Sequence, residues 1–160
     1  MLVIRPAAER DYAAIVRWDQ NRKEPYLRQW SGPDVYRYPL TEGQIARQAG
    51  RDGVHLYMAC DGETPIGTGE ISGVSEAEGT GNICRLLFAE EARNKGFGEA
   101  FLKGLSRIAF AQMGLSALNL RVFCFNIPAI RCYEKVGFRV KAFFEEADPH
   151  WNNYWMEYRK

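Results

Sequence analysis

The sequence predicts a mixed α/β domain, in which about four helices flank a mostly antiparallel sheet of six to seven strands. Two observations support this class. A chain of 160 residues with 46% hydrophobic and 26% charged residues suits one domain with one core. Three apolar runs separated by turn residues also precede the longest helical pattern, which predicts a meander of strands before the main helix. We therefore treat residues 1–160 as a single domain.

In the first part of the chain, short runs with helix or strand periodicity are separated by prolines and glycines. In order, it predicts a strand at 2–5, a helix at 9–20, an irregular segment at 24–40 and a short helix at 41–50. The segment 24–40 is expected to be irregular because it contains three prolines and a glycine. Thr41 is the expected N-cap of the short helix, with Gln44 in the capping-box position.

The rest of the chain alternates between strand and helix patterns. Strands are predicted at 54–60, 66–74, 82–88, 118–125, 138–144 and 154–158, and helices at 96–113 and 126–134. "DGETP" at 61–65 predicts a hairpin turn, and Gly137 is a typical stop after the last helix. Strands that follow one another before the main helix favour a mixed sheet over a doubly wound parallel sheet.

Composition excludes several classes of function. Lys and Arg total 21 and Asp and Glu total 20, so the net charge of +1 gives no case for nucleic acid or a membrane surface as partner. The chain has neither an apolar run of about 18 residues nor the h-region of a signal peptide, so we expect a cytoplasmic protein. The four cysteines form no C-x-x-C pair and the two histidines are far apart, which predicts reduced thiols and no metal site.

The most informative stretch is "EEARNKGFGEAF" at 90–101, which joins a predicted strand to the longest predicted helix. A helix N-terminus offers unpaired N–H groups to an anion, and glycines let the backbone approach it. The stretch lacks the Walker pattern, and Phe101 stands where a dinucleotide fingerprint needs its third glycine. Taken alone, it predicts either a phosphate site or simply the turn that starts a helix.

Two blocks together resemble the GNAT superfamily of N-acetyltransferases. The first is the R-x-x-G-x-G run from Arg93 to Gly98, and the second is "RVFCFNIPAIRCYEKVGFR" at 121–139. They occur in the family's order, with room between them for one helix and one strand, and the resemblance covers about 82–144. "LRVFCFN" is closest to the branch of ribosomal-protein N-terminal acetyltransferases, although many members of that branch lack the tyrosine.

The resemblance implies acetyl-CoA as co-substrate, with no metal. It implies a pyrophosphate site on the N–H groups of 94–99, pantetheine along 86–88, and a sheet splayed between the strands at 82–88 and 118–125. A main-chain N–H near Leu87 or Phe88 would stabilise the oxyanion. The implied cofactor-binding residues are Leu86, Leu87, Phe88, Arg93, Asn94, Lys95, Gly96, Phe97, Gly98, Glu99, Asn126, Ala129 and Tyr133.

Tyr133 is the predicted catalytic acid, because a nearby phenol can protonate the thiolate that leaves a thioester. Some family members have a glutamate five residues before the asparagine, but this chain has Arg121 there. Glu70 is the predicted base, and direct transfer with water as proton acceptor remains the alternative. We expect sequential transfer without a covalent enzyme intermediate.

The acceptor is expected to be a primary amine, on a small molecule or at a peptide N-terminus. Trp30, Tyr36 and Tyr38 are the predicted acceptor-binding residues, because aromatic side chains in a long early loop suit a pocket. Two alternatives remain open: a non-catalytic acyl-CoA sensing module, and a transferase for another acyl-CoA with Arg85 or Arg121 facing the acyl group. The sequence leaves the oligomeric state open, with a homodimer among the options.

Overall fold

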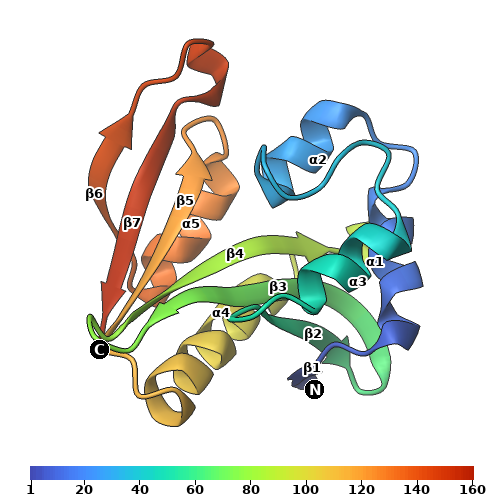
Figure 1. Cartoon of the computed structure of the whole chain (residues 1–160), viewed down its shortest axis with the longest axis horizontal. Helices are drawn as coiled ribbons and strands as arrows, with labels where there is room; N and C mark the ends of the chain where they lie inside the picture. The colour runs from blue at the N-terminus through green and yellow to red at the C-terminus, as the bar shows by residue number, and fades with distance from the viewer.

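The computed structural model describes all residues from Met1 to Lys160. One seven-stranded sheet runs through the molecule in the order β1-β2-β3-β4-β5-β7-β6 (Figure 1). The strands are β1 Leu2–Pro6, β2 His55–Asp61, β3 Thr64–Ser75, β4 Thr80–Phe88, β5 Ala117–Phe123, β6 Arg139–Phe144 and β7 Asn153–Arg159. Every neighbouring pair is antiparallel except β4 and β5. The predicted mixed, mostly antiparallel sheet is therefore confirmed.

The helices include one that the sequence did not predict. They are α1 Tyr12–Asp19, α2 Glu24–Ser31, α3 Glu42–Ala49, α4 Phe97–Arg107 and α5 Ile127–Val136. The prediction that residues 24–40 are irregular throughout was wrong, because Pro25 lies in the first turn of α2, where its missing N–H costs nothing. A π-helical turn, Ile108–Gln112, continues α4. None of the helices combines the length and the apolar character that crossing a membrane requires.

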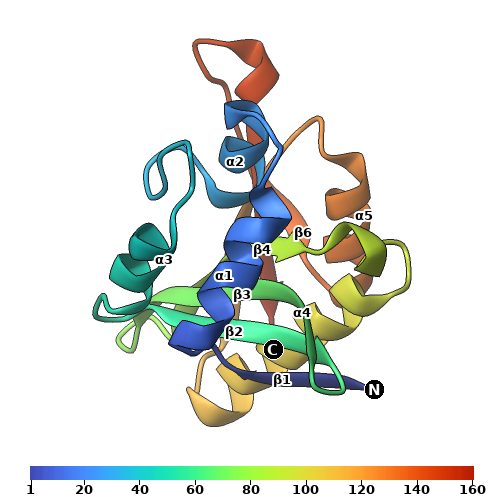
Figure 2. The ribbon, with the colours of Figure 1, turned by 90° about the vertical axis from the view of Figure 1, so that its right-hand side faces the viewer.

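Helices cover both faces of the sheet, because successive side chains of a strand point to opposite faces. On β2, Leu56, Met58 and Cys60 join the core cluster that contains residues of α1, α2 and α3. Ala59 between them joins the larger cluster, which contains the buried side of α4 and α5. Figure 2 shows α3 and α4 on opposite sides of the sheet. This arrangement leaves the ends of β4 and β5 between the two groups of helices.

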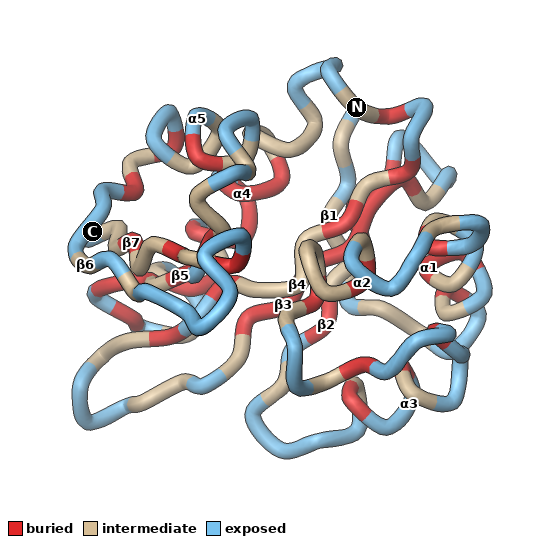
Figure 3. The backbone as a smooth tube through the Cα atoms, turned by 90° about the horizontal axis from the view of Figure 1, so that it is seen from above, coloured by how far each residue is buried: buried red, intermediate tan, exposed pale blue.

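The sheet opens between its two central strands. Pairing of β4 with β5 covers three positions and ends at Asn82 and Asn119. Beyond it β4 is irregular: Arg85 has a φ of 54° and the β3–β4 register shifts between Thr68 and Glu70, which is typical of a β-bulge. Seen from above, β5 to β7 with α5 diverge from β1 to β3 with α1 to α3 (Figure 3). The predicted splay between these strands is confirmed.

Candidate active site

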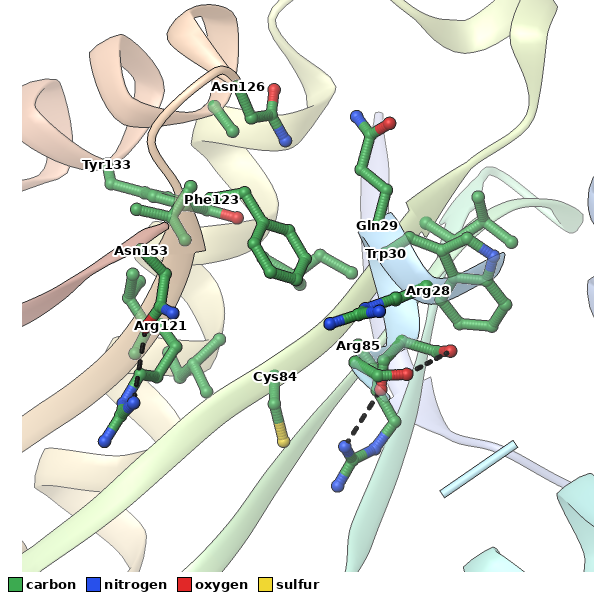
Figure 4. A pocket seen from close by; sticks show the side chains of 18 of the residues that line it. Arg28, Gln29, Trp30, Cys84, Arg85, Arg121, Phe123, Asn126, Tyr133 and Asn153 are labelled. Carbon is green, nitrogen blue, oxygen red and sulfur yellow. Dashed lines mark hydrogen bonds between the residues drawn. The ribbon is translucent and has the colours of Figure 1, made fainter. Parts of the chain in front are cut away.

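A cleft of about 1150 Å³ occupies the opening between β4 and β5. Its walls come from α2, the edge of β4, the loop before α4, the end of β5, the start of α5 and the β6–β7 hairpin. Figure 4 shows side chains from these elements converging on it. Segments from both ends of the chain therefore meet the glycine loop at a single site.

The glycine loop presents a row of free backbone donors. Asn94 and Gly96 both have left-handed dihedrals, with φ of 59° and 81°, and α4 begins at Phe97 without a side-chain cap. The first N–H of the helix to find a protein partner is that of Ala100, which donates to the Gly96 carbonyl. The N–H groups of 94–99 have no protein acceptor. Such a row at a helix N-terminus is a site for an anion.

The edge of β4 that faces the opening offers further backbone groups. The Ala89 N–H donates to the Ile66 carbonyl of β3 at 2.9 Å. Because backbone groups alternate along a strand, the N–H and carbonyl of Phe88 point to the other, open edge. The Phe88 N–H therefore faces the cleft, at the last residue of β4.

Arg93 organises this corner of the cleft. Its guanidinium donates two hydrogen bonds to the Phe88 carbonyl, at 3.1 and 3.3 Å, and a third to the Tyr26 hydroxyl of α2. These contacts tie the glycine loop to β4 and α2. Arg93 lines the cleft, yet its donors are largely used within the protein, which favours a positioning role.

Tyr133 projects from α5 into the cleft (Figure 4). Its ring packs edge-on against the buried Phe138, with ring centroids 6.2 Å apart. Burial raises the pKa of the Tyr133 phenol well above its usual range, so the group stays protonated at neutral pH. Its hydroxyl has no hydrogen-bond partner in the protein and is free to donate to a group in the cleft.

Asn126 precedes α5 but does not cap it through its side chain. Instead the amide lines the cleft, and Figure 4 shows it on the same side of the cleft as Tyr133. Ala129, in the first turn of α5, lines the same wall with its small side chain. The side chain of Asn126 is thus available to a bound molecule.

Nine of the thirteen residues predicted to bind the coenzyme line the cleft. They are Leu86, Leu87, Phe88, Arg93, Asn94, Gly98, Asn126, Ala129 and Tyr133. The other four, Lys95, Gly96, Phe97 and Glu99, belong to the loop and first turn of α4, and their side chains do not line it. Phe97 packs against the core, and Glu99 accepts a hydrogen bond from Lys103 at 2.8 Å. Their backbone N–H groups, which have no protein acceptor, are what these four residues offer to an anion in the cleft.

Of the three predicted acceptor residues, the structure brings one to the cleft. Trp30 lines it, held by a 2.8 Å hydrogen bond from its indole to Asp19. Tyr36 does not, because it is buried in the core cluster of α1 to α3. Tyr38 does not line it either and is largely exposed. The irregular segment thus contributes less to the cleft than α2 does.

Glu70, the predicted base, is completely buried on β3 and does not line the cleft. One carboxylate oxygen accepts hydrogen bonds from Arg85 at 3.0 Å and Gln48 at 3.2 Å, while the other has no partner. Arg85 also donates to the Ser31 carbonyl of α2. The geometry favours Glu70 as the anion that fixes Arg85 at the cleft wall.

We expect Arg85→Met to lower the free energy of unfolding by about 3–5 kcal/mol, because it leaves the buried carboxylate of Glu70 without its cation. Urea unfolding followed by fluorescence measures this. The double variant Glu70→Leu/Arg85→Met should regain most of the loss, since it removes both charges. Equal destabilisation of the single and double variants would show that packing, and not the ion pair, matters here.

The cysteines at the site are poor nucleophiles. All four cysteines of the chain are free, and Cys84 and Cys132 line the cleft. Burial raises the pKa of the Cys84 thiol to about 11 and also raises that of Cys132. Both therefore remain thiols at neutral pH, which suits transfer without an enzyme-bound intermediate. No group of three or more His, Cys, Asp or Glu side chains is arranged to hold a metal ion.

Away from the glycine loop the cleft has a cationic and aromatic wall, of which the sequence pointed only to Arg121. Arg28 of α2 reaches across the cleft toward Phe123 and lies over the ring of Trp151, 4.1 Å from its centroid (Figure 4). Arg121 lies over Phe144 and donates to Asn153 at 3.3 Å. Neither arginine forms a salt bridge. The clustering of aromatic residues at 123–125 and 151–155 was the available signal.

Comparison with known proteins shows the family of the chain. A sequence model described as the acetyltransferase (GNAT) family matches residues 14–138. The L-amino acid N-acetyltransferase AaaT of Escherichia coli (strain K12) is 27% identical over 143 residues, which cover 88% of this chain and 85% of that protein.

Solved structures share the fold across nearly the whole chain. The spermidine N-acetyltransferase of Vibrio cholerae, in complex with CoA and spermine, has a TM-score of 0.83 at 16% identity, covering 99% of this chain and 95% of that one. AAC(6')-Ib in complex with paromomycin and acetyl-CoA has a TM-score of 0.77 at 22% identity, covering 99% and 93%. At these identities the two structures show a common fold.

Proposed function

Because the chain belongs to the acetyltransferase (GNAT) family, it is an N-acetyltransferase that uses acetyl-CoA, and we propose that its acceptor is a small molecule carrying a primary amine beside a carboxylate. The observation that carries the proposal is the charge of the cleft. Four arginines line it, and only two acidic residues do. They are Arg28, Arg85, Arg93 and Arg121, against Asp34 and Glu146.

Two of these arginines remain available to a ligand. Arg85 is paired with Glu70, and Arg93 with the Phe88 carbonyl. The Arg28 side chain makes no hydrogen bond, and its buried Nε has no partner, while the Arg121 side chain bonds only to the neutral Asn153. The guanidinium of the half-buried Arg28 has no anion beside it, which is costly where water is partly excluded, and a carboxylate matches its fork of donors.

A polycationic acceptor fits this charge pattern poorly. A polyamine would have to approach Arg28 and Arg121 with its positive charges, and only Asp34 and Glu146 would attract it. The name of the relative AaaT, an L-amino acid N-acetyltransferase, is consistent with an acceptor that carries both groups. The neighbours named for spermidine and in complex with paromomycin support the fold alone.

We propose that the coenzyme lies along β4 with its pyrophosphate on the N–H groups of 94–99, which have no other acceptor. The open edge of β4 would then hydrogen-bond the pantetheine arm. This places the thioester near the Phe88 N–H, which would donate to the oxyanion as the amine attacks. Asn126 would add a side-chain hydrogen bond to the coenzyme from the facing wall.

Tyr133 would complete the transfer. When the C–S bond breaks, its neutral hydroxyl gives a proton to the departing sulfur, so coenzyme A leaves as a thiol. The acceptor amine, which is mostly protonated at neutral pH, would lose one proton to cleft water before it attacks and a second as the amide forms, because Glu70 does not reach the cleft. One of these two protons would return through water to the Tyr133 oxygen, so that one proton is released overall. Since burial holds the pKa of Tyr133 above its usual value, this acid stays protonated across the physiological range.

A panel of amines tests the proposal. Release of free thiol from acetyl-CoA should be fastest with free α-amino acids. It should be at least about tenfold slower with the corresponding amino acid amides, in which a neutral amide replaces the carboxylate. Arg28→Gln should raise KM for the amino acid and leave KM for acetyl-CoA unchanged. Faster turnover with spermidine or with a peptide N-terminus would overturn the acceptor assignment.

A further inference from the structure

A second pocket, of about 490 Å³, lies on α3 and the loop before it, away from the acetyl-transfer cleft. Its lining residues are Val35, Arg37, Thr41, Gln44, Arg47, Gln48 and Arg51, which we call the arginine pocket. Val35 is the one apolar side chain among them, and no acidic residue lines it. The pocket is therefore polar and cationic, unlike the mostly apolar pockets that bind apolar ligands.

The three arginines of the pocket have no anion in the protein. None of them takes part in any salt bridge. The guanidiniums of Arg37 and Arg47 donate no hydrogen bond, and Arg51 donates one, to the neutral side chain of Gln48 at 3.3 Å. Three like charges around one concavity repel each other, and a bound anion would remove that repulsion.

The pocket is also preformed. The Gln44 side chain accepts a hydrogen bond from the Arg37 N–H at 2.7 Å and donates to the Arg37 and Pro39 carbonyls at 3.0 and 2.9 Å. Thr41 caps α3 by accepting from the Gln44 N–H. These bonds hold the loop against the helix, so little ordering is required when a ligand binds.

One wall of the arginine pocket connects to the acetyl-transfer cleft through side chains. Gln48 is 4% exposed, and its amide accepts from Arg51 and donates to Glu70 at 3.2 Å. Glu70 in turn holds Arg85, which lines the cleft and bonds the Ser31 carbonyl of α2. A continuous row therefore runs from Arg51 to Arg85.

We propose that the arginine pocket binds a small phosphate-class oxyanion, and that its occupancy alters acceptor binding through Gln48, Glu70 and Arg85. An oxyanion would draw Arg51 away from the Gln48 carbonyl oxygen and leave the Gln48 amide free to reorient. The hydrogen bond from Gln48 to the Glu70 carboxylate would then change. This change would shift Arg85 and, through the Ser31 carbonyl, the end of α2 that Arg85 holds. The coupling rests on the proposed function, whereas binding itself does not.

Calorimetric titration with inorganic pyrophosphate tests the binding, with coenzyme A present at saturation so that the glycine loop is occupied. Wild-type protein should release heat at constant ionic strength. The variant Arg47→Gln/Arg51→Gln should bind at least about tenfold more weakly, while Arg107→Gln, an exposed arginine on α4, should bind like wild type. An absence of heat, or an equal loss in Arg107→Gln, would overturn the site.

Steady-state kinetics at saturating acetyl-CoA tests the coupling. Pyrophosphate should change KM for the acceptor at least about twofold in wild-type enzyme. It should leave this KM unchanged in Arg47→Gln/Arg51→Gln and in Gln48→Met, although the latter variant keeps the three arginines. An unchanged KM in wild type despite measured heat would refute the coupling. A lack of turnover with every amine would instead refute the proposed function and leave the titration valid.

Discussion

Replacing Tyr133 by phenylalanine is expected to lower kcat on the order of 100-fold and to leave the affinity for acetyl-CoA nearly unchanged. The variant loses only the hydroxyl, which has no partner in the protein, while the ring keeps its packing against Phe138. Thiol release measures kcat, and calorimetric titration with coenzyme A measures affinity. The loss should not be larger, because a thiol of pKa about 8.5 is a fair leaving group without help.

The neighbouring Cys132→Ser variant is the matched control, since Cys132 lines the same wall of the cleft but has no assigned role in the reaction. It should retain kcat within about twofold. If Tyr133→Phe turned over like wild type, the phenol would have no part in protonating the sulfur. If Cys132→Ser lost as much as Tyr133→Phe, the effect would reflect the shape of the wall instead.

Replacing Gly98 by aspartate should raise Kd for acetyl-CoA on the order of 100-fold. The new carboxylate would lie at the row of free N–H groups that we propose binds the pyrophosphate, and it would repel that anion. The free energy of unfolding of the unliganded protein should not fall. Gly98 lies in the first turn of α4, where an acidic side chain favours the helix by about 0.3–1 kcal/mol. Calorimetry of coenzyme A binding and thermal unfolding without ligand measure the two effects separately.

Gly98→Ala separates charge from size. A Cβ at this position would meet Cys132 Sγ at 3.9 Å and a Phe88 ring carbon at 4.0 Å, which are ordinary contacts. The alanine variant should therefore bind acetyl-CoA within about threefold of wild type. Equal loss in the alanine and aspartate variants would mean that the glycine is needed for space, and the anion argument would fail.

Sequence patterns predicted well the segments that form the glycine-loop end of the cleft, because that end is built from contiguous segments. The strand, glycine loop and helix around Gly96 follow one another in the chain, and so do the strand, Asn126 and α5. Each unit carries its own turn chemistry and periodicity. The parallel pairing that ends at Asn82 then opens the sheet beside them.

The opposite end of the cleft, which we propose binds the acceptor, could not be predicted in the same way, because it is assembled from segments distant in sequence. Arg28 and Trp151 meet only because α2 and the β6–β7 hairpin face each other across the cleft, and Pro25 concealed α2 in the sequence. Aromatic side chains in a loop suit either a pocket or a core, so the sequence did not separate the two for Tyr36. The structure buries Tyr36 in the core. The burial of Glu70 likewise depends on Gln48 and Arg85 from other elements.

The central claim is that one cleft holds the coenzyme by backbone N–H groups at one end and delivers its sulfur to Tyr133. A crystal structure of the complex with coenzyme A tests it most directly. We expect the pyrophosphate oxygens to accept hydrogen bonds from the N–H groups of 94–99, and the sulfur to lie about 3–4 Å from the Tyr133 hydroxyl. A pyrophosphate bound away from this row, or a sulfur beyond the reach of Tyr133, would contradict the account.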